Sequence, residues 1–153
     1  MTGIRNFVQM TEAVGTSRQP TAAQFDEIAQ AGYSAVVNLA MPDSDDALAD
    51  EGSLVTALGM KYIHIPVPFD APTKEHLRSF IRVMRAIDAY KVWVHCVVNA
   101  RVFGLHVSLA SAAAFRPRLM SIDAISSNPI TKNPPVINMP SRWLFPVRYT
   151  TAP

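Results

Sequence analysis

The fold is decided by residues 92–101, which read Val92-Trp93-Val94-His95-Cys96-Val97-Val98-Asn99-Ala100-Arg101. Their first half is a short apolar run typical of a buried strand, and it ends on Cys96, the one cysteine of the chain. Arg101 follows five positions later, where the pattern predicts that a helix begins. A thiol and a guanidinium at the two ends of one short loop suit an anionic ligand.

The segments before this loop alternate between apolar strands and amphipathic helices. The predicted strands cover residues 7–9, 33–39, 61–67 and 91–95, and residues 14–17 are predicted to form either another short strand or a turn. The predicted helices run from a cap at Thr21 to Gly32, over 47–58, onward from a cap at Thr73, and over 102–115. This alternation predicts an α/β fold of three layers, with a central, mainly parallel sheet between flanking helices. Ligands of such sheets bind beyond the carboxyl ends of the strands, where Cys96 and Asp70 both lie.

The composition fits a globular chain of one domain, with 153 residues, 49% of them hydrophobic, 17% charged and a net charge of +2. That charge is too small to predict binding to nucleic acid or to an acidic membrane surface. The chain has no apolar run of about 18 residues and no signal-peptide pattern at its start, so we expect no membrane span and no secretion. A single cysteine cannot form an internal disulfide, which favours a reducing, cytoplasmic location.

The composition changes after Arg101. Residues 1–101 contain eleven acidic and nine basic residues, whereas residues 102–153 contain one acidic and five basic residues. Seven of the twelve prolines lie between positions 117 and 153, where they exclude long helices. We therefore expect an α/β domain over 1–116 and a proline-rich tail over 117–153, which either completes that domain or is poorly ordered. A frameshift from Val102 or Phe103 onward is an alternative explanation of the change.

Several short motifs follow one another in a specific order: Thr16-Ser17-Arg18-Gln19-Pro20-Thr21, Val36-Val37-Asn38-Leu39, Asp50-Glu51, Tyr62-Ile63-His64-Ile65-Pro66-Val67, Pro72-Thr73 and residues 94–101. As a series they resemble a bacterial dual-specificity-phosphatase-like group of the protein-tyrosine-phosphatase superfamily, over residues 7–103. The resemblance implies a cysteine-based phosphatase fold, in which a His-Cys-x-x-Asn-x-Arg loop binds phosphate between the last parallel strand and a helix. It does not extend into the tail.

The loop differs from the usual phosphatase pattern in two respects. Four residues rather than five separate Cys96 from Arg101, a short form that the bacterial group also carries. A shorter loop makes a smaller ring of N–H groups, and it is also similar to the loop of rhodanese sulfurtransferases, where the cysteine carries a persulfide. In addition, Val102 stands where phosphatases usually place a serine or threonine that helps expel the thiolate.

The resemblance and the residue chemistry together assign the main roles at this loop. Cys96 is the expected nucleophile, because loop N–H groups, a helix N-terminus and Arg101 all favour its thiolate. Arg101 is expected to hold the substrate oxygens bidentately. The other expected phosphate-binding positions are His95, Val97, Val98, Asn99 and Ala100.

Three residues have more specific predicted roles. His95 is expected to orient the loop through hydrogen bonds rather than to act as a base. Asn99 is expected to adopt a left-handed backbone, and possible partners for its side chain lie across the loop. Asp70, which follows a neighbouring strand, is the candidate general acid that protonates the leaving oxygen.

Less specific explanations exist for the same residues. Cys96 alone fits a small buried core residue, Arg101 a solvated first-turn residue, and Asp70 an ordinary polar loop residue. We expect a solvated acidic face at Asp43, Asp45, Asp46, Asp50 and Glu51. The four histidines have no zinc-binding spacing, so we expect no metal and no cofactor.

The first functional prediction is a phosphatase that hydrolyses phosphate monoesters through a phospho-cysteine. The alternatives are sulfur transfer through a persulfide at Cys96, and a non-catalytic module that only binds anions. The expected ligand is phosphate, sulfate or another small oxyanion, and the pattern names no particular phosphorylated substrate. Apolar positions between 105 and 115 would favour self-association, so a homodimer is a further expectation.

Overall fold

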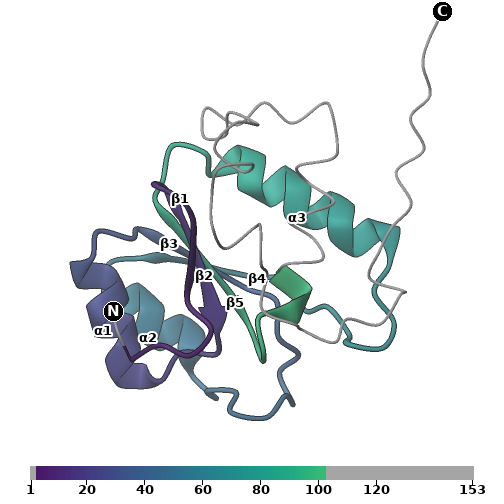
Figure 1. Cartoon of the computed structure of the whole chain (residues 1–153), viewed down its shortest axis with the longest axis horizontal. Coiled ribbons are helices and arrows are strands. Elements are labelled where there is room, and N and C mark those ends of the chain that lie inside the picture. Colours follow the sequence, from purple (N-terminus) through teal and green to yellow (C-terminus); the bar gives the residue numbers. More distant parts are fainter. Residues whose placement is uncertain (1–2, 103–153) are drawn as a thin grey trace, which may run out of the picture.

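The computed structural model describes residues 3–102, which build one sheet with helices on both faces (Figure 1). The strands are β1 (Val8–Thr11), β2 (Val14–Arg18), β3 (Ala35–Asn38), β4 (Lys61–His64) and β5 (Val92–Cys96). The helices are α1 (Ala22–Gln30), α2 (Glu51–Ala57) and α3 (Lys74–Ala86). The strand order is β1-β2-β5-β3-β4, and only β1 pairs antiparallel with its neighbour. The predicted α/β fold with a mainly parallel sheet is confirmed.

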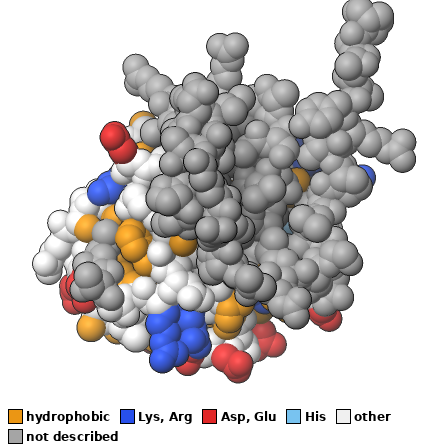
Figure 2. Space-filling model, in the orientation of Figure 1, with side chains coloured by type: hydrophobic (Ala, Val, Ile, Leu, Met, Phe, Trp, Pro, Cys, Tyr) orange, Lys and Arg blue, Asp and Glu red, His pale blue; other side chains and the backbone are white. Residues whose placement is uncertain are grey.

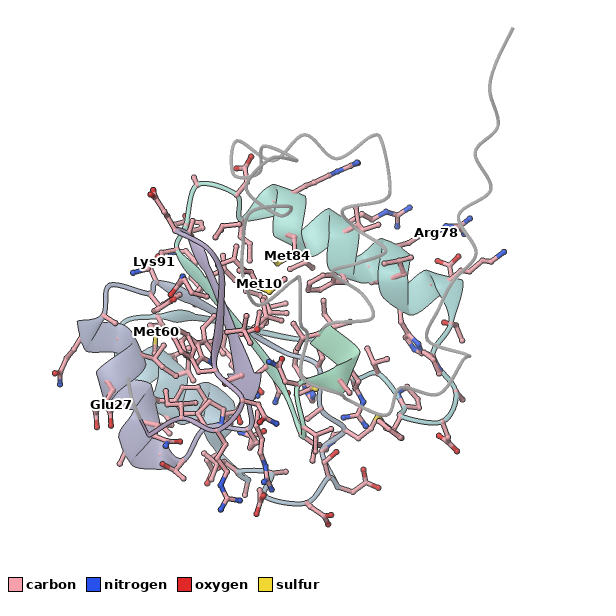
Figure 3. All side chains as sticks on the ribbon, viewed as in Figure 1. Met10, Glu27, Met60, Arg78, Met84 and Lys91 are labelled. Carbon is pink, nitrogen blue, oxygen red and sulfur yellow. The ribbon has the colours of Figure 1, made fainter. Side chains whose placement is uncertain are left out.

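The sheet separates two hydrophobic clusters, and β5 lies between them at its centre. One cluster joins α1 and α2 to the sheet, and the other joins α3 to the opposite face. Figure 3 shows Met60 on the α1–α2 side and Met84 with Met10 on the α3 side. All five residues of β5 are buried, because helices cover this strand on both faces. The loop after β5 therefore begins at the end of a strand that is central in the sheet and buried along its whole length.

Two of the helices begin at the caps that the sequence predicts, Thr21 and Thr73. The Thr21 side chain accepts from the Gln24 amide, and the Gln24 side chain accepts from the Thr21 amide at 2.9 Å, which closes a capping box on α1. Thr73 and His76 make the same reciprocal pair at the start of α3. Gly32, just past α1, has a φ of 84°, a conformation in which a side chain would be strained.

The predicted helix over 47–58 is wrong at its start, because α2 begins only at Glu51. Asp46 has a φ of 63°, and the Ala47 amide donates to the Ser44 carbonyl at 3.1 Å. A left-handed residue interrupts a helix, so the acidic segment forms turns that run up to the N-cap, Asp50. Glu51 is thereby the first helical residue, and this position decides its role below.

The predicted strands 33–39 and 61–67 are longer than β3 and β4, although backbone pairing continues beyond both. The Ile65 amide donates to the Asn38 carbonyl at 2.9 Å, and the Val67 amide donates to the Leu39 carbonyl at 3.2 Å. This pairing holds the segment that leads to Asp70 against the centre of the sheet.

Predictions for the end of the chain lie outside the described residues. These are the helix over 102–115, the tail over 117–153, the domain boundary at 116 and the self-association of that region. Within residues 3–102, no helix is long and apolar enough to cross a lipid bilayer.

Candidate functional site

The loop that follows β5 adopts the backbone that the sequence predicts. Cys96 is the last residue of the strand, residues 97–99 bend, and helical residues begin at Ala100. Asn99 has a φ of 67°, which confirms its predicted left-handed backbone. Cys96 is fully buried among core residues of the α3 side. This burial agrees both with a nucleophile at the base of the loop and with the core alternative.

Asn99 fastens the loop to the segment before β1 and to β2. Its Nδ2 donates to the Asn6 carbonyl at 2.9 Å and to Thr16 Oγ1 at 3.2 Å. In return, Asn6 Nδ2 donates to the Val98 carbonyl at 3.3 Å. The prediction that the Asn99 side chain bonds across its own loop is therefore wrong. The side chain is buried, and it donates to groups of β2 and of the segment before β1 instead.

Arg101 carries a buried guanidinium, two nitrogens of which find no hydrogen-bond partner among the described residues. The residue is 4% exposed, and its Nε and Nη1 have no hydrogen-bond partner within the described part of the chain. The guanidinium carbon lies 5.4 Å from the centre of the Phe69 ring. A solvated first-turn arginine is thus excluded. Because leaving buried donors without a partner is costly, an anion bound here would satisfy both nitrogens.

Arg101 lines a pocket of about 570 Å³ together with Asp70, Val97 and Val98. Asp70 is exposed in the segment after β4, so the structure brings it to the loop from 26 positions earlier in the chain. Met41, Asp43, Ser44, Asp45, Pro68 and Phe69 complete the lining. Among residues 3–102, no three His, Cys, Asp or Glu side chains are grouped as metal ligands would be.

Behind the loop, Glu51 is buried, although its place in an acidic run predicted a solvated position. Its side chain is buried, at 3% exposed, and His95 Nε2 lies 3.0 Å from its Oε1. Asn38 Nδ2 donates to the same oxygen at 2.9 Å, and Gln19 Nε2 donates to Oε2. The predicted solvated face is therefore wrong for Glu51, whereas the other four acidic residues of that face are exposed.

The surroundings of Glu51 keep its carboxylate ionised. Burial raises the pKa of Glu51, but the hydrogen bond and charge of His95 and the bond from Gln19 outweigh burial and bring this pKa below its ordinary value. Tyr62 responds in the opposite direction: burial, with the nearby Glu51 charge, raises its pKa to about 12. His95 therefore contacts a carboxylate on α2 instead of lining the pocket, which agrees with an orienting role.

A signal for Glu51 was present in the sequence. Val55 is buried on α2, and residues four positions apart share one face of a helix. Glu51 therefore falls on the same, buried face as Val55 in any helix that contains both residues. The helix predicted over 47–58 contains the same relation, but Glu51 was grouped with the preceding acidic residues as one solvated face.

Comparison with known proteins gives one family and several similar folds. The family model described as a polymorphic toxin system DSP-PTPase phosphatase matches residues 9–104. A candidate phosphatase of the DUF442 group from Shewanella putrefaciens CN-32 is 34% identical, with a TM-score of 0.69 and coverage of 75% of this chain and 78% of that one. Tk-PTP in its active form is 25% identical, with a TM-score of 0.58 and coverage of 74% and 78%.

A more distant structure shares the fold only. TpbA of P. aeruginosa, solved as a cysteine-to-serine variant with phosphotyrosine, is 18% identical with a TM-score of 0.54, over 65% of this chain and 59% of that one. No curated protein sequence matches the chain.

Proposed function

The chain belongs to the DSP-PTPase phosphatase family of polymorphic toxin systems, and we propose that it hydrolyses phosphate monoesters through a phospho-cysteine at Cys96. The observation that carries this proposal is the buried guanidinium of Arg101, whose Nε and Nη1 lack partners among the described residues. It lies beside the loop that starts at Cys96 and shares its pocket with Asp70. A phosphate dianion supplies the charge and the oxygens that these donors need.

The reaction proceeds in two steps. In the first, the Cys96 thiolate attacks phosphorus and the bond from phosphorus to the ester oxygen breaks, while Asp70 gives its proton to that oxygen. In the second, water attacks the phospho-cysteine, Asp70 takes a proton from the water, and the Cys96 thiolate leaves with its electron pair. Arg101 and the loop amides stabilise the three equatorial oxygens in both transition states.

His95 and Glu51 support this chemistry from behind the loop. The Glu51 carboxylate fixes the His95 ring at one nitrogen, and the next residue in the strand is the nucleophile. The two side chains contact each other at 3.0 Å on the α2 side of the sheet, whereas Cys96 belongs to the cluster on the α3 side, so both are positioning residues rather than catalytic ones. Val102 is buried, at 1% exposed, and has no hydroxyl to assist the departing thiolate. The loop amides and Arg101 must therefore perform that task alone.

The test is turnover of an aryl phosphate by the full chain, with Cys96→Ser as the matched variant. We expect phosphate release that the variant loses, together with a phosphorylated enzyme that can be trapped by rapid acid quench. Thiocyanate production from thiosulfate and cyanide, without phosphate release, would instead establish sulfur transfer. Phosphate binding without either activity would leave only an anion-binding module.

Arg101→Lys separates the role of the guanidinium from that of its charge. Lysine keeps the positive charge but cannot form a bidentate contact with two oxygens. We expect kcat/KM for the aryl phosphate to fall by about 10²-fold or more, as when an oxyanion donor is removed. Full activity in the lysine variant would contradict the proposed clamp.

A further inference from the structure

Two arginines lie next to the phosphate-binding loop but outside it. Arg18 is the last residue of β2, and in the parallel register it lies opposite Cys96. The Arg18 amide donates to the Arg5 carbonyl at 3.1 Å, which holds the two residues together. The adjoining residue, Asn6, bonds to the loop itself through the Val98 carbonyl. Both arginines therefore border the place where the proposed phosphate binds.

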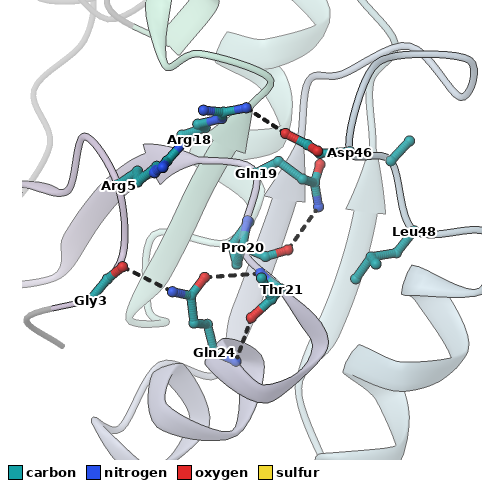
Figure 4. Close-up of a pocket in the computed structure, with 10 residues that line it drawn as sticks. Gly3, Arg5, Arg18, Gln19, Pro20, Thr21, Gln24, Asp46 and Leu48 are labelled. Carbon is teal, nitrogen blue, oxygen red and sulfur yellow. Dashed lines mark hydrogen bonds and ion pairs between the residues drawn. The ribbon is translucent and has the colours of Figure 1, made fainter.

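Arg5 and Arg18 line a second pocket, of about 530 Å³ (Figure 4). Thr21 and Gln24, which also line it, are engaged with each other in the capping box of α1. The polar groups free to receive a ligand are thus chiefly the guanidinium groups. Arg5 is exposed and makes no ion pair with any described residue.

Arg18 is held by a single carboxylate that a ligand can replace. Its guanidinium pairs with Asp46, and the two side chains are 26% and 59% exposed. β2 and β3 are the two neighbours of β5, so this ion pair joins the end of β2 to the segment after β3, across the end of the Cys96 strand. An exposed pair of this kind contributes little stability, so exchanging its carboxylate for another anion costs little.

The two sides of the loop differ in charge. Arg5 and Arg18 line the second pocket with one carboxylate, that of Asp46, whereas Arg101 lines the first with three, those of Asp43, Asp45 and Asp70. Figure 2 shows basic side chains next to acidic ones along the lower edge of the molecule. An anionic group that extends beyond the bound phosphate is repelled on the first side and attracted on the second.

We propose that the pocket of Arg5 and Arg18 is a subsite for a second anionic group of the substrate, a phosphate or a carboxylate. The substrate class is then a phosphate monoester with a further negative group a few bonds away. When this group arrives, it takes the place of Asp46 on Arg18. The inference rests on the proposed function for the position of the first phosphate.

The test measures binding by calorimetry at low salt, with alkane bisphosphonates of increasing chain length and the matching alkyl monophosphonates. These ligands are not hydrolysed, so binding is measured separately from the aryl phosphatase assay. We expect one bisphosphonate to bind the full chain at least about 10-fold more tightly than its monophosphonate, as for one added charge-assisted contact. Loss of turnover with this preference intact would reject only the proposed catalysis.

Two variants, one that removes a positive charge and one that removes a negative charge, distinguish ligand recognition from a structural role of the Arg18–Asp46 ion pair. Arg18→Gln should remove the preference and leave monophosphonate binding within about 2-fold, and Arg5→Gln should reduce the preference. Asp46→Asn, which tolerates the left-handed backbone at this position, should strengthen the preference because it releases Arg18. Equal binding of both ligands by the wild-type chain overturns the proposal. The proposal is also overturned if Arg18→Gln and Asp46→Asn change the preference for the bisphosphonate in the same direction, because the ion pair would then have only a structural role.

Discussion

Replacing Glu51 with alanine removes the acceptor on which three buried donors converge. These donors come from His95, Asn38 and Gln19, and the carboxylate that they share is 3% exposed. A buried donor that loses its partner costs about 1–3 kcal/mol, and three such donors lose their partner here. Allowing for partial relaxation around the site, we expect Glu51→Ala to lower the free energy of unfolding by about 3–5 kcal/mol, a large share of the stability of a small domain.

Glu51→Gln probes the charge with almost the same shape. The amide keeps one accepting oxygen but turns a donor toward a buried donor, so we expect a loss of about 1–2 kcal/mol. Asp50→Ala is the matched control: Asp50 is adjacent and exposed and makes no side-chain cap bond, so its removal should change stability by less than about 0.5 kcal/mol. The assay is urea unfolding followed by far-UV circular dichroism.

The pH dependence gives a second, independent measurement. Because the pKa of Glu51 is lowered in the fold, ionised Glu51 contributes stability above its unfolded pKa of about 4.3, and this contribution is lost as pH falls through the folded pKa. The stability difference between wild type and Glu51→Gln should therefore shrink below about pH 4. A loss under about 1 kcal/mol for Glu51→Ala, or a difference that does not shrink in acid, would refute the described network.

Three further predictions concern the loop and its surroundings. Asp70→Asn should slow turnover of phenyl phosphate by about 10²-fold and that of 4-nitrophenyl phosphate much less, since a good leaving group needs no proton; equal effects would remove Asp70 from the mechanism. Asn99→Ala should lower the free energy of unfolding by about 2–4 kcal/mol, because it loses two hydrogen bonds and places alanine at a φ of 67°. Asn99→Gly loses the same hydrogen bonds but adopts this φ without strain, so it should recover part of the lost stability in thermal unfolding. The pKa of Tyr62 is raised to about 12 in the fold, so the stability it contributes is complete below its unfolded pKa of about 10 and is lost as pH rises toward 12. Tyr62→Phe should flatten the alkaline decline in unfolding experiments, and an unchanged slope would contradict this environment.

Much of the site was predictable because it is built from local patterns. The apolar run before Cys96 predicts a buried strand, and Thr21 and Thr73 predict helix starts from spacing alone. Asn99 is the residue of its loop that best tolerates a left-handed backbone, so its conformation also follows from residue type. In each case the physical cause acts within a few residues of the chain.

The roles of Glu51, Arg101 and Arg18 were decided by tertiary structure. Glu51 looked like part of a charged surface, because its burial depends on donors from β3, from β5 and from Gln19, the residue after β2. Arg101 Nε and Nη1 are buried in the fold, and the described chain offers them no acceptor. Arg18 reaches the end of the Cys96 strand through sheet pairing between residues 78 positions apart.

The sequence by itself thus determined which residue types meet at the carboxyl end of the sheet: a thiol, an arginine and a nearby carboxylate. Strand order, register and burial determined which of them face the pocket and which face the core. The reason is physical: periodicity and capping act over one or two turns, whereas desolvation and charge pairing depend on all the segments that come together at one place. Cys96 and Arg101 could therefore be identified from one stretch of the sequence. Glu51 and Arg18 could not, because only the folded sheet places them near that stretch.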